Sequence, residues 1–159
     1  MRRTKGFSLI ELLIVVAIIL IIAAIAIPSF LHSRMAANES VAAASIRTLN
    51  TAQLSYNSAY PTVGFAALLS NLAGSCAGAT LPTSTNACLI DSQLASGTRS
   101  GYSFTLTNVS GSPSSTYSVI AAPVLANYSG VRYFCSYADA VVRVSVTTIS
   151  TCDGTVSPQ

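Results

Sequence analysis

Hydrophobic residues form one nearly unbroken run close to the start of the chain. The segment from Phe7 to Ile27 holds 21 residues, and only Ser8 and Glu11 among them are polar. As an α-helix this segment would be roughly 31 Å long, close to the thickness of the hydrocarbon core of a bilayer. A carboxylate in such a segment is unfavourable even near its end, so the position of Glu11 indicates a function.

Helical periodicity continues over residues 29–60. Apolar side chains recur there at spacings of three, four or seven residues and would form one stripe along a helix. The stripe consists of Leu31, Met35, Ala42, Ile46, Leu49, Ala52 or Gln53, and Tyr56, whereas Asn38, Glu39, Arg47, Asn50 and Asn57 occupy other positions. A stripe of this length predicts that the helix packs on its own domain with one half and on other chains with the other half.

Pro28 lies between the two halves of this predicted helix. Proline cannot donate to the helical hydrogen-bond ladder, so we expect a kink or local unwinding at this position. The simpler alternative is that Pro28 ends a membrane-spanning segment.

The rest of the chain changes its pattern twice. Residues 61–100 have no clean period and are punctuated by proline and glycine, which predicts a loop with one short helix within residues 65–72. Residues 101–150 alternate between apolar and polar side chains, which predicts three to four antiparallel strands. The strands are expected near residues 102–107, 117–121, 131–136 and 141–149, with a turn over residues 111–115. One apolar sheet face packed on the helix stripe gives an α+β fold.

Charge is scarce and unevenly placed. Charged residues make up 8% of the chain, against about 25% in an ordinary soluble domain. The net charge of +3 comes from Arg2, Arg3 and Lys5, because residues 7–159 carry five basic and five acidic side chains. Positive charge before an apolar helix keeps that end in the cytoplasm and places the rest outside. The charge is therefore an orientation signal, and no specific nucleic-acid partner is expected.

A removable secretion signal is the main alternative for the N-terminal segment. The basic start, the apolar core and the small residues of Ala24-Ile25-Ala26 are the features that a signal peptidase requires. Against this, Glu11 interrupts the apolar core, and the run exceeds the roughly 7–15 residues of a signal core. The residues alone leave a membrane anchor, a removed signal and other roles open.

The sequence from Lys5 to Ile19, KGFSLIELLIVVAII, is followed by an alanine-rich helix and Pro28. This pattern resembles the N-terminal signature of the type IV pilin family, which includes the pseudopilins of type II secretion. The resemblance implies that a prepilin peptidase cuts between Gly6 and Phe7 and that the new Phe7 amine is N-methylated. Glu11 would then pair with the Phe7 amine of a neighbouring subunit and fix the register of assembly.

The resemblance also implies a division of the chain. Residues 1–6 would be the leader, and residues 7–28 the helix that lies first in the membrane and then in the filament core. Residues 29–60 would be the amphipathic second half of this helix. Residues 61–159 would form the C-terminal globular domain of a pilin fold, with a disulfide-bounded loop after the sheet.

Four cysteines, an even number, suit an exported chain that forms disulfides. Four cysteines allow three pairings. We expect the pairs that are local in sequence, Cys76 with Cys88 and Cys135 with Cys152. The second pair would bound a C-terminal loop of the kind that pilins have.

The sequence shows no recognisable catalytic chemistry. His32 is the only histidine, no glycine-rich phosphate loop is present, and the five carboxylates are scattered. We therefore expect no enzymatic activity, no cofactor and no metal site.

The function implied by the resemblance is that of a structural subunit, a type IV pilin that polymerises into a helical filament. Its partners would be further copies of the chain, the prepilin peptidase and N-methyltransferase, an inner-membrane assembly platform and, before assembly, the lipid bilayer. It would be located in the bacterial inner membrane, with a cytoplasmic N-terminus, and then in a pilus on the cell surface.

Three alternatives remain for the function: a periplasmic pseudopilin of type II secretion, a minor pilin, and an exported binding protein that loses its first 26 residues. Only Asp139 and Asp153 are acidic near the C-terminus. Major pseudopilins typically have an acidic, calcium-binding loop, which two acidic residues do not resemble. Two disulfides are more typical of pilins. These two features favour the pilus subunit.

Overall fold

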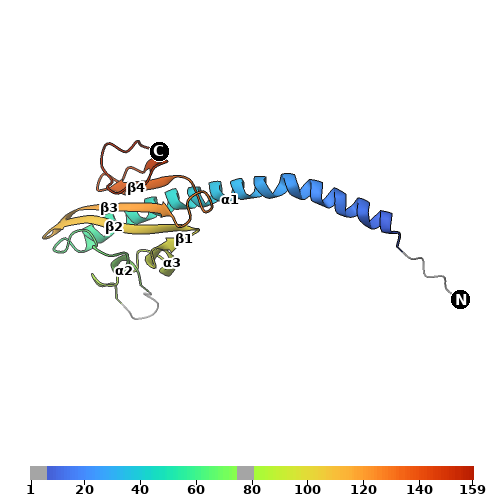
Figure 1. Cartoon of the computed structure of the whole chain (residues 1–159). Coiled ribbons are helices and arrows are strands. Elements are labelled where there is room, and N and C mark those ends of the chain that lie inside the picture. Colours follow the sequence, from blue (N-terminus) through green and yellow to red (C-terminus); the bar gives the residue numbers. More distant parts are fainter. Residues whose placement is uncertain (1–6, 75–80) are drawn as a thin grey trace. The chain divides into compact units, whose positions relative to one another are not determined.

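The computed structural model describes residues 7–74 and 81–159 (Figure 1). The chain divides into two compact units, one ending at Arg34 and the other covering Met35–Gln159. In the first unit the described residues form the N-terminal part of one helix. The second unit combines the remainder of that helix with a sheet and two short helices.

Helix α1 (Leu9–Ala59) has 51 residues. It contains no glycine, and its commonest residue is alanine, the strongest helix former. It ends before Tyr60, because Pro61 disfavours the helical conformation in the residue that precedes it. These bounds lie within two residues of the predicted helix.

The sheet has five antiparallel strands arranged in sequence order. They are β1 (Thr98–Arg99), β2 (Tyr102–Gly111), β3 (Ser114–Pro123), β4 (Tyr133–Tyr137) and β5 (Arg143–Ser145). The predicted count of three to four strands was low by at least one. β1 lies inside the predicted loop of residues 61–100, and its two residues are too few to show an alternating pattern.

The last strand is shorter than predicted. β5 takes up three residues of the expected 141–149, and the C-terminal segment bonds back along it. The N–H of Val144 donates to the Ser157 carbonyl at 2.9 Å, and the N–H of Gln159 donates to the Val142 carbonyl at 3.0 Å. The hydrogen-bonding groups at this edge of the sheet are thus partly satisfied by the end of the same chain.

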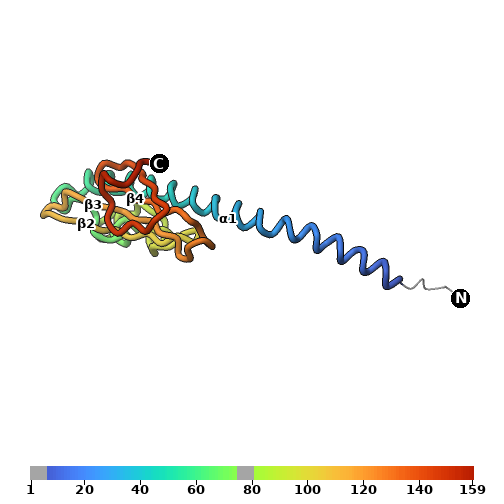
Figure 2. Tube along the Cα trace, turned by 45° about the horizontal axis from the view of Figure 1, so that its top comes forward, coloured from blue at the N-terminus to red at the C-terminus, as the bar shows by residue number. Residues whose placement is uncertain are grey.

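Side chains of the central strands alternate between two hydrophobic clusters. Val119 of β3 and Phe134 of β4 lie in the cluster that contains the buried residues of α1. Their neighbours Ile120 and Cys135 lie in a second cluster with Cys152. Since successive strand residues point to opposite faces, α1 covers one face of the sheet and the C-terminal segment covers the other. Figures 1 and 2 show the sheet between these two layers.

The predicted stripe supplies the buried face of α1 in the second unit. Its buried members are Ala42, Ile46, Leu49, Ala52, Gln53 and Tyr56. Two polar residues that the periodicity placed elsewhere, Glu39 and Asn50, are also buried. They are tolerated because each forms hydrogen bonds to the sheet side of the domain, as described below.

Two short helices precede the sheet. α2 (Leu69–Leu72) lies within the predicted residues 65–72. α3 (Ser92–Ala95) was not predicted, although Asp91 is a favourable N-cap residue and accepts a hydrogen bond from the N–H of Leu94 at 2.8 Å. The segment expected to be a loop therefore carries α2, α3 and β1.

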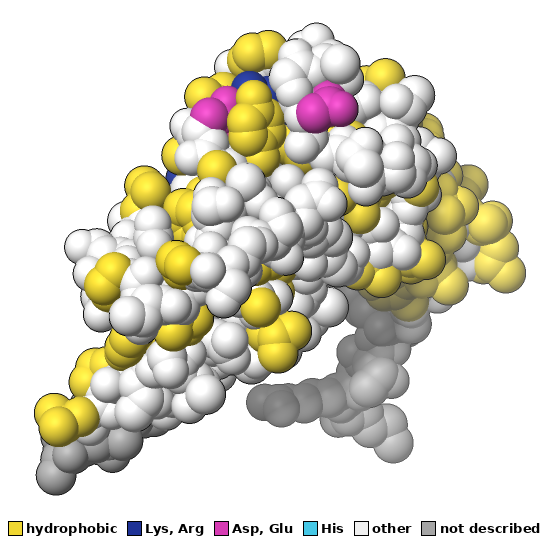
Figure 3. Space-filling view, turned by 90° about the vertical axis from the view of Figure 1, so that its left-hand side faces the viewer, with side chains coloured by type: hydrophobic (Ala, Val, Ile, Leu, Met, Phe, Trp, Pro, Cys, Tyr) yellow, Lys and Arg dark blue, Asp and Glu magenta, His cyan; other side chains and the backbone are white. Residues whose placement is uncertain are grey.

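Charged side chains are sparse on the surface and largely paired. On the face shown in Figure 3, acidic and basic side chains gather near the top, and uncharged side chains and backbone cover the rest. Three ion pairs hold six of the charges of the second unit: Arg99–Asp91, Arg132–Glu39 and Arg143–Asp139.

Candidate assembly segment

Glu11 caps the N-terminus of α1. The backbone N–H of Ser8 donates to Glu11 Oε2 at 2.9 Å, and the N–H of Leu12 donates to the Ser8 carbonyl at 3.3 Å. Ser8 is therefore the N-cap residue and Glu11 the third helical residue, the position from which a glutamate reaches back to the N-cap N–H. The helix macrodipole also favours a negative charge there. The single carboxylate of the apolar segment thus has a partner within its own chain.

The capping role of Ser8 was not predicted, although Ser-x-x-Glu before an apolar run is its sequence signature. Phe7, the residue before the cap, is 78% exposed. Gly6 lies outside the described residues, so cleavage between Gly6 and Phe7 stays a prediction.

The helix that follows the cap presents apolar side chains on all sides. From Phe7 to Arg34 every residue is exposed except Ala23, which is partly buried. α1 is the one helix among the described residues that is long and apolar enough to cross a membrane, and its most apolar 18-residue window has a mean hydropathy of 3.3. A helix that is hydrophobic all round needs lipid or other protein around it.

Pro28 lies inside α1 without interrupting it. Local unwinding, one of the two outcomes expected, is therefore not found in this state of the chain. Proline removes one hydrogen bond, that to the carbonyl four residues earlier, and long helical segments on both sides hold the conformation. The helix continues past Pro28 to Ala59, so the end of a membrane-spanning segment at Pro28 also stays a prediction. A kink at Pro28 stays a prediction.

In the second unit, α1 is attached to the segment between β3 and β4 through Glu39. Glu39 Oε1 accepts hydrogen bonds from the N–H groups of Val131 at 2.8 Å and Arg132 at 3.1 Å. Glu39 Oε2 accepts a third from Arg132 Nε at 2.7 Å. Beside it, Asn38 Nδ2 donates to the Ser129 carbonyl at 2.9 Å.

The protonation of Glu39 follows from these contacts. Burial alone would raise the pKa of Glu39, but the N–H groups of Val131 and Arg132 and the guanidinium of Arg132 outweigh burial and lower it. Glu39 therefore stays ionised in the folded protein at neutral pH and accepts all three of these hydrogen bonds.

Two amide side chains attach α1 at its other end. Gln53 Nε2 donates to the Ala66 carbonyl at 3.0 Å, and the Ala66 N–H donates to Gln53 Oε1 at 2.8 Å. Asn50 Nδ2 donates to Ser136 Oγ at 2.9 Å, and the Tyr117 hydroxyl donates to Asn50 Oδ1 at 3.1 Å. Burial first, and the nearby Asp139 carboxylate second, raise the pKa of Tyr117 to about 12, so this hydroxyl remains a donor.

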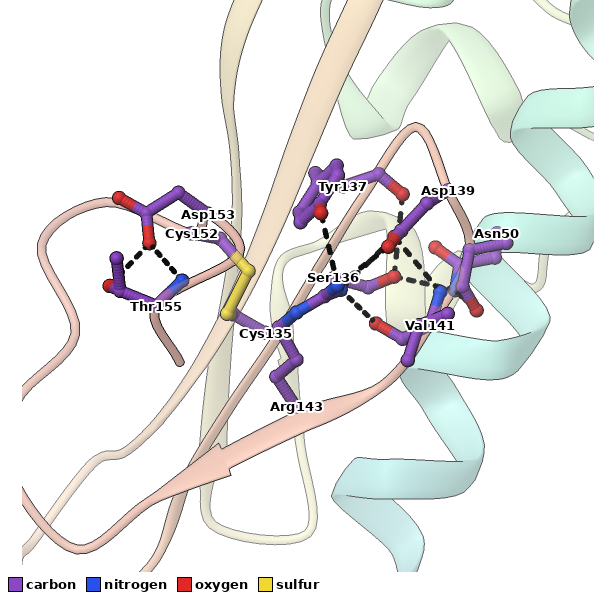
Figure 4. Close-up of polar contacts among 11 residues, drawn as sticks. Asn50, Cys135, Ser136, Tyr137, Asp139, Val141, Arg143, Cys152, Asp153 and Thr155 are labelled. Carbon is purple, nitrogen blue, oxygen red and sulfur yellow. Dashed lines mark hydrogen bonds and ion pairs between the residues drawn. A yellow bond between two sulfur atoms is a disulfide. The ribbon is translucent and has the colours of Figure 1, made fainter. Parts of the chain in front are cut away.

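Asp139 and Arg143 form an ion pair close to Asn50 (Figure 4). The Arg143 guanidinium donates to both carboxylate oxygens of Asp139, at 3.1 and 2.6 Å, and to the Tyr137 hydroxyl at 3.0 Å. It also lies over the Tyr137 ring, 4.2 Å from the ring centroid. Burial alone would raise the pKa of Asp139, but the bonds from Arg143 lower it. The pair stabilises the turn between β4 and β5.

The C-terminal segment is fixed to β4 by a disulfide. Cys135 is joined to Cys152 with a Cα–Cα distance of 5.8 Å, the pairing expected from the sequence. Just after it, Asp153 Oδ1 accepts hydrogen bonds from the Thr155 N–H at 2.9 Å and hydroxyl at 2.6 Å. Cys76, the expected partner of Cys88, lies outside the described residues, so that pair stays a prediction.

Comparison with known proteins places the similarity at the N-terminus. Residues 1–27 match the family described as the prokaryotic N-terminal methylation motif. Over 54 residues, 34% of this chain, the sequence is 52% identical to the type IV major pilin protein PilA of Myxococcus xanthus (strain DK1622). Over 44 residues, 28% of this chain, it is 59% identical to the type IV wide pilus major component PilA4 of Thermus thermophilus. No solved structure gives a significant match.

The matched segments span 24% of the Myxococcus protein and 34% of the Thermus protein. The family match at residues 1–27 includes the capped start of α1 and much of its apolar part, and the C-terminal unit contains the antiparallel sheet. The chain therefore carries a prokaryotic N-terminal methylation motif over residues 1–27 and is similar, over about a third of its length, to two major components of type IV pili.

Proposed function

We propose that this chain is a structural subunit of a type IV pilus, polymerised through the N-terminal half of α1. The observation that carries the proposal is the exposed apolar surface of residues 7–34 in a chain whose remaining residues form a folded domain. Lipid covers this surface before assembly, and other copies of the chain cover it afterwards. The two relatives, both named as major pilus components, support a pilus over a secretion pseudopilus.

Processing prepares the chain for assembly in this proposal. A prepilin peptidase removes residues 1–6 by cutting between Gly6 and Phe7, and the new Phe7 amine is N-methylated. Gly6 allows a close approach to the backbone because it has no side chain. The apolar helix survives the cut, since it lies entirely on the C-terminal side of the cleaved bond.

Glu11 sets the register between subunits. Apolar helices slide past one another at little cost, so one charge pair can select a single offset. The Phe7 amine of a neighbouring subunit would attract the Glu11 carboxylate by roughly 4 kcal/mol at about 4 Å in an effective dielectric of about 20, before desolvation is subtracted. In the neighbour's absence, the Ser8 N–H holds the carboxylate.

Two substitutions separate the effect of the Glu11 charge from the effect of its hydrogen bond to the Ser8 N–H. Glu11→Gln keeps an acceptor for the Ser8 N–H but has no charge, whereas Glu11→Ala removes both. If an ion pair sets the register, both variants should be processed, remain in the membrane and give few filaments. Normal filament yield from Glu11→Gln would show that capping alone suffices and would refute the charge pair.

Mass spectrometry of the mature N-terminus tests the processing step. An N-methylated Phe7 is expected, and Gly6→Val should leave the longer precursor on a gel. A mature chain that begins at Ile27 would instead identify an ordinary secretion signal. Electron microscopy of surface fibres, with the subunit identified in them, separates a pilus from a periplasmic pseudopilus.

A further inference from the structure

The segment between β3 and β4 exposes a group of apolar side chains. Val124, Leu125, Tyr128 and Val131, here called the loop patch, are 56%, 59%, 59% and 42% exposed. They lie within eight consecutive residues, and none of these eight is charged. Apolar side chains gathered in a short exposed loop are candidates for a contact with another molecule.

The loop that carries the patch is held in one conformation by hydrogen bonds. The Ser129 hydroxyl donates to the Leu125 carbonyl at 3.0 Å and accepts from the Leu125 N–H at 3.1 Å. The Asn127 N–H donates to the Gly130 carbonyl at 2.9 Å, and the Val124 N–H donates to the Gly101 carbonyl at 2.9 Å. A preordered loop loses little conformational entropy on binding.

The same loop is fixed to α1. Glu39 accepts from the N–H groups of Val131 and Arg132, and Asn38 donates to the Ser129 carbonyl. Asn38 and Glu39 lie close to the start of the part of α1 that belongs to the second unit. A neighbour that packs along α1 at this level would therefore lie close to the loop that carries the patch.

Size and charge decide which neighbour suits the patch. Four half-exposed apolar side chains offer on the order of 300 Å², whereas a specific complex needs about 800 Å² from each partner. The patch is too small to bind a free partner by itself, but it suffices for a molecule already held nearby by another interface. Arg132, the charged side chain next to the patch, is paired with Glu39, so an uncharged surface fits best.

We propose that the loop patch binds the exposed apolar part of α1, residues 9–31, of a second copy of this chain during assembly. This inference rests on the proposed function, because polymerisation through α1 brings the second copy close. The N-terminal part of α1 is uncharged after Glu11 as far as Leu31, which matches the patch in chemistry. The contact would position the globular domain of one subunit on the helix of another.

Paired substitutions in the full chain test the contact. Leu125→Asp combined with Tyr128→Asp should lower the yield of sheared filaments at least tenfold, with processing and membrane insertion unchanged. Leu68→Asp is the matched control, since Leu68 is 60% exposed on the segment that leads into α2 and should leave the yield near that of the wild type. Wild-type yield from the double variant would overturn the proposal.

Photo-crosslinking provides a readout that does not depend on the folding of charged variants. With p-benzoylphenylalanine in place of Tyr128, irradiated filaments should contain a crosslinked dimer whose second site maps to residues 9–31. Filaments without this dimer, or with a crosslink to another region, to lipid or to a different protein, would overturn the loop contact. A wild-type chain that forms no filaments would instead refute the proposed function itself.

Discussion

Arg132 meets Glu39 twice, through its backbone N–H at 3.1 Å and through its side-chain Nε at 2.7 Å. The carboxylate belongs to α1, and the guanidinium lies just before β4. One buried acidic side chain thus fixes both the backbone and the side chain of a residue 93 positions away in sequence. Charge is so scarce in this chain that a pair of this kind indicates a specific structural role.

Glu39→Ala should destabilise the domain by about 2–3 kcal/mol, because it leaves the N–H groups of Val131 and Arg132 without their acceptor in a partly buried site. Denaturant unfolding of the full chain in detergent micelles measures the free energy of unfolding. Arg99→Ala is the control, since it removes the more exposed Arg99–Asp91 pair but leaves Asp91 as the cap of α3, and it should cost less than about 1 kcal/mol. Equal losses in the two variants would contradict the role given to Glu39.

The pKa of Glu39 gives this contribution a pH dependence. Its folded-state pKa lies below the ordinary value of 4.5, so the ionised form stabilises the fold at pH values above the unfolded pKa. This stability should be lost as the pH falls through the lowered folded-state pKa. Unfolding measured from pH 6 down to about pH 3 should show a shallower decline in Glu39→Gln than in the wild type. Parallel curves would assign the acid sensitivity to other carboxylates, such as Asp139.

Gln53→Ala should destabilise the domain by about 2–3 kcal/mol, because both the N–H and the carbonyl of buried Ala66 would lose their partner. Gln53→Glu should also be destabilising, since a carboxylate cannot donate to the Ala66 carbonyl. Thermal unfolding of the full chain in micelles provides the comparison. Gln93→Ala is the control, because Gln93 is exposed on α3 and should leave stability within about 0.5 kcal/mol.

Replacing Cys135 and Cys152 together by serine should lower stability by about 3 kcal/mol on the chain-entropy account of a loop of this size. Both cysteines are buried in a cluster with Ile120 and Ile149, so loosening of the C-terminal segment should follow. Limited proteolysis should then cut first between Val146 and Gln159. Unchanged protease resistance would mean that the hydrogen bonds of Ser157 and Gln159 are sufficient to hold the segment.

The long helix and the longer strands were predicted best, because their hydrophobic pattern repeats over many residues. Fifty-one residues of helix and the ten-residue strands β2 and β3 repeat their pattern often enough to be recognised. β1, with two residues, and α3, with four, do not. Short elements were therefore predicted unevenly, since α2, with four residues, was expected and α3 was not, and the bounds of β2 and β3 extend beyond the predicted residues 102–107 and 117–121.

The polar attachment of α1 was missed for another reason. Glu39 and Asn50 are polar and were assigned to the exposed side of the helix, because periodicity cannot reveal partners that are about 90 residues away in sequence. Glu11 stood out in the sequence because its segment is almost entirely apolar, and its role in assembly stays a prediction. The bond from the Ser8 N–H to the Glu11 carboxylate was missed although its signal is local, in four consecutive residues.

The pairing of charges within the second unit affects how strongly the association of copies depends on salt. Arg99, Arg132 and Arg143 each have an acidic partner in the same chain, so few net charges remain to act between subunits. Dissolved salt weakens attraction between exposed charges beyond about 10 Å at about 0.1 M, but it hardly weakens apolar contacts. Contacts between the globular domains of neighbouring subunits should therefore be about equally strong in dilute and in strongly saline surroundings.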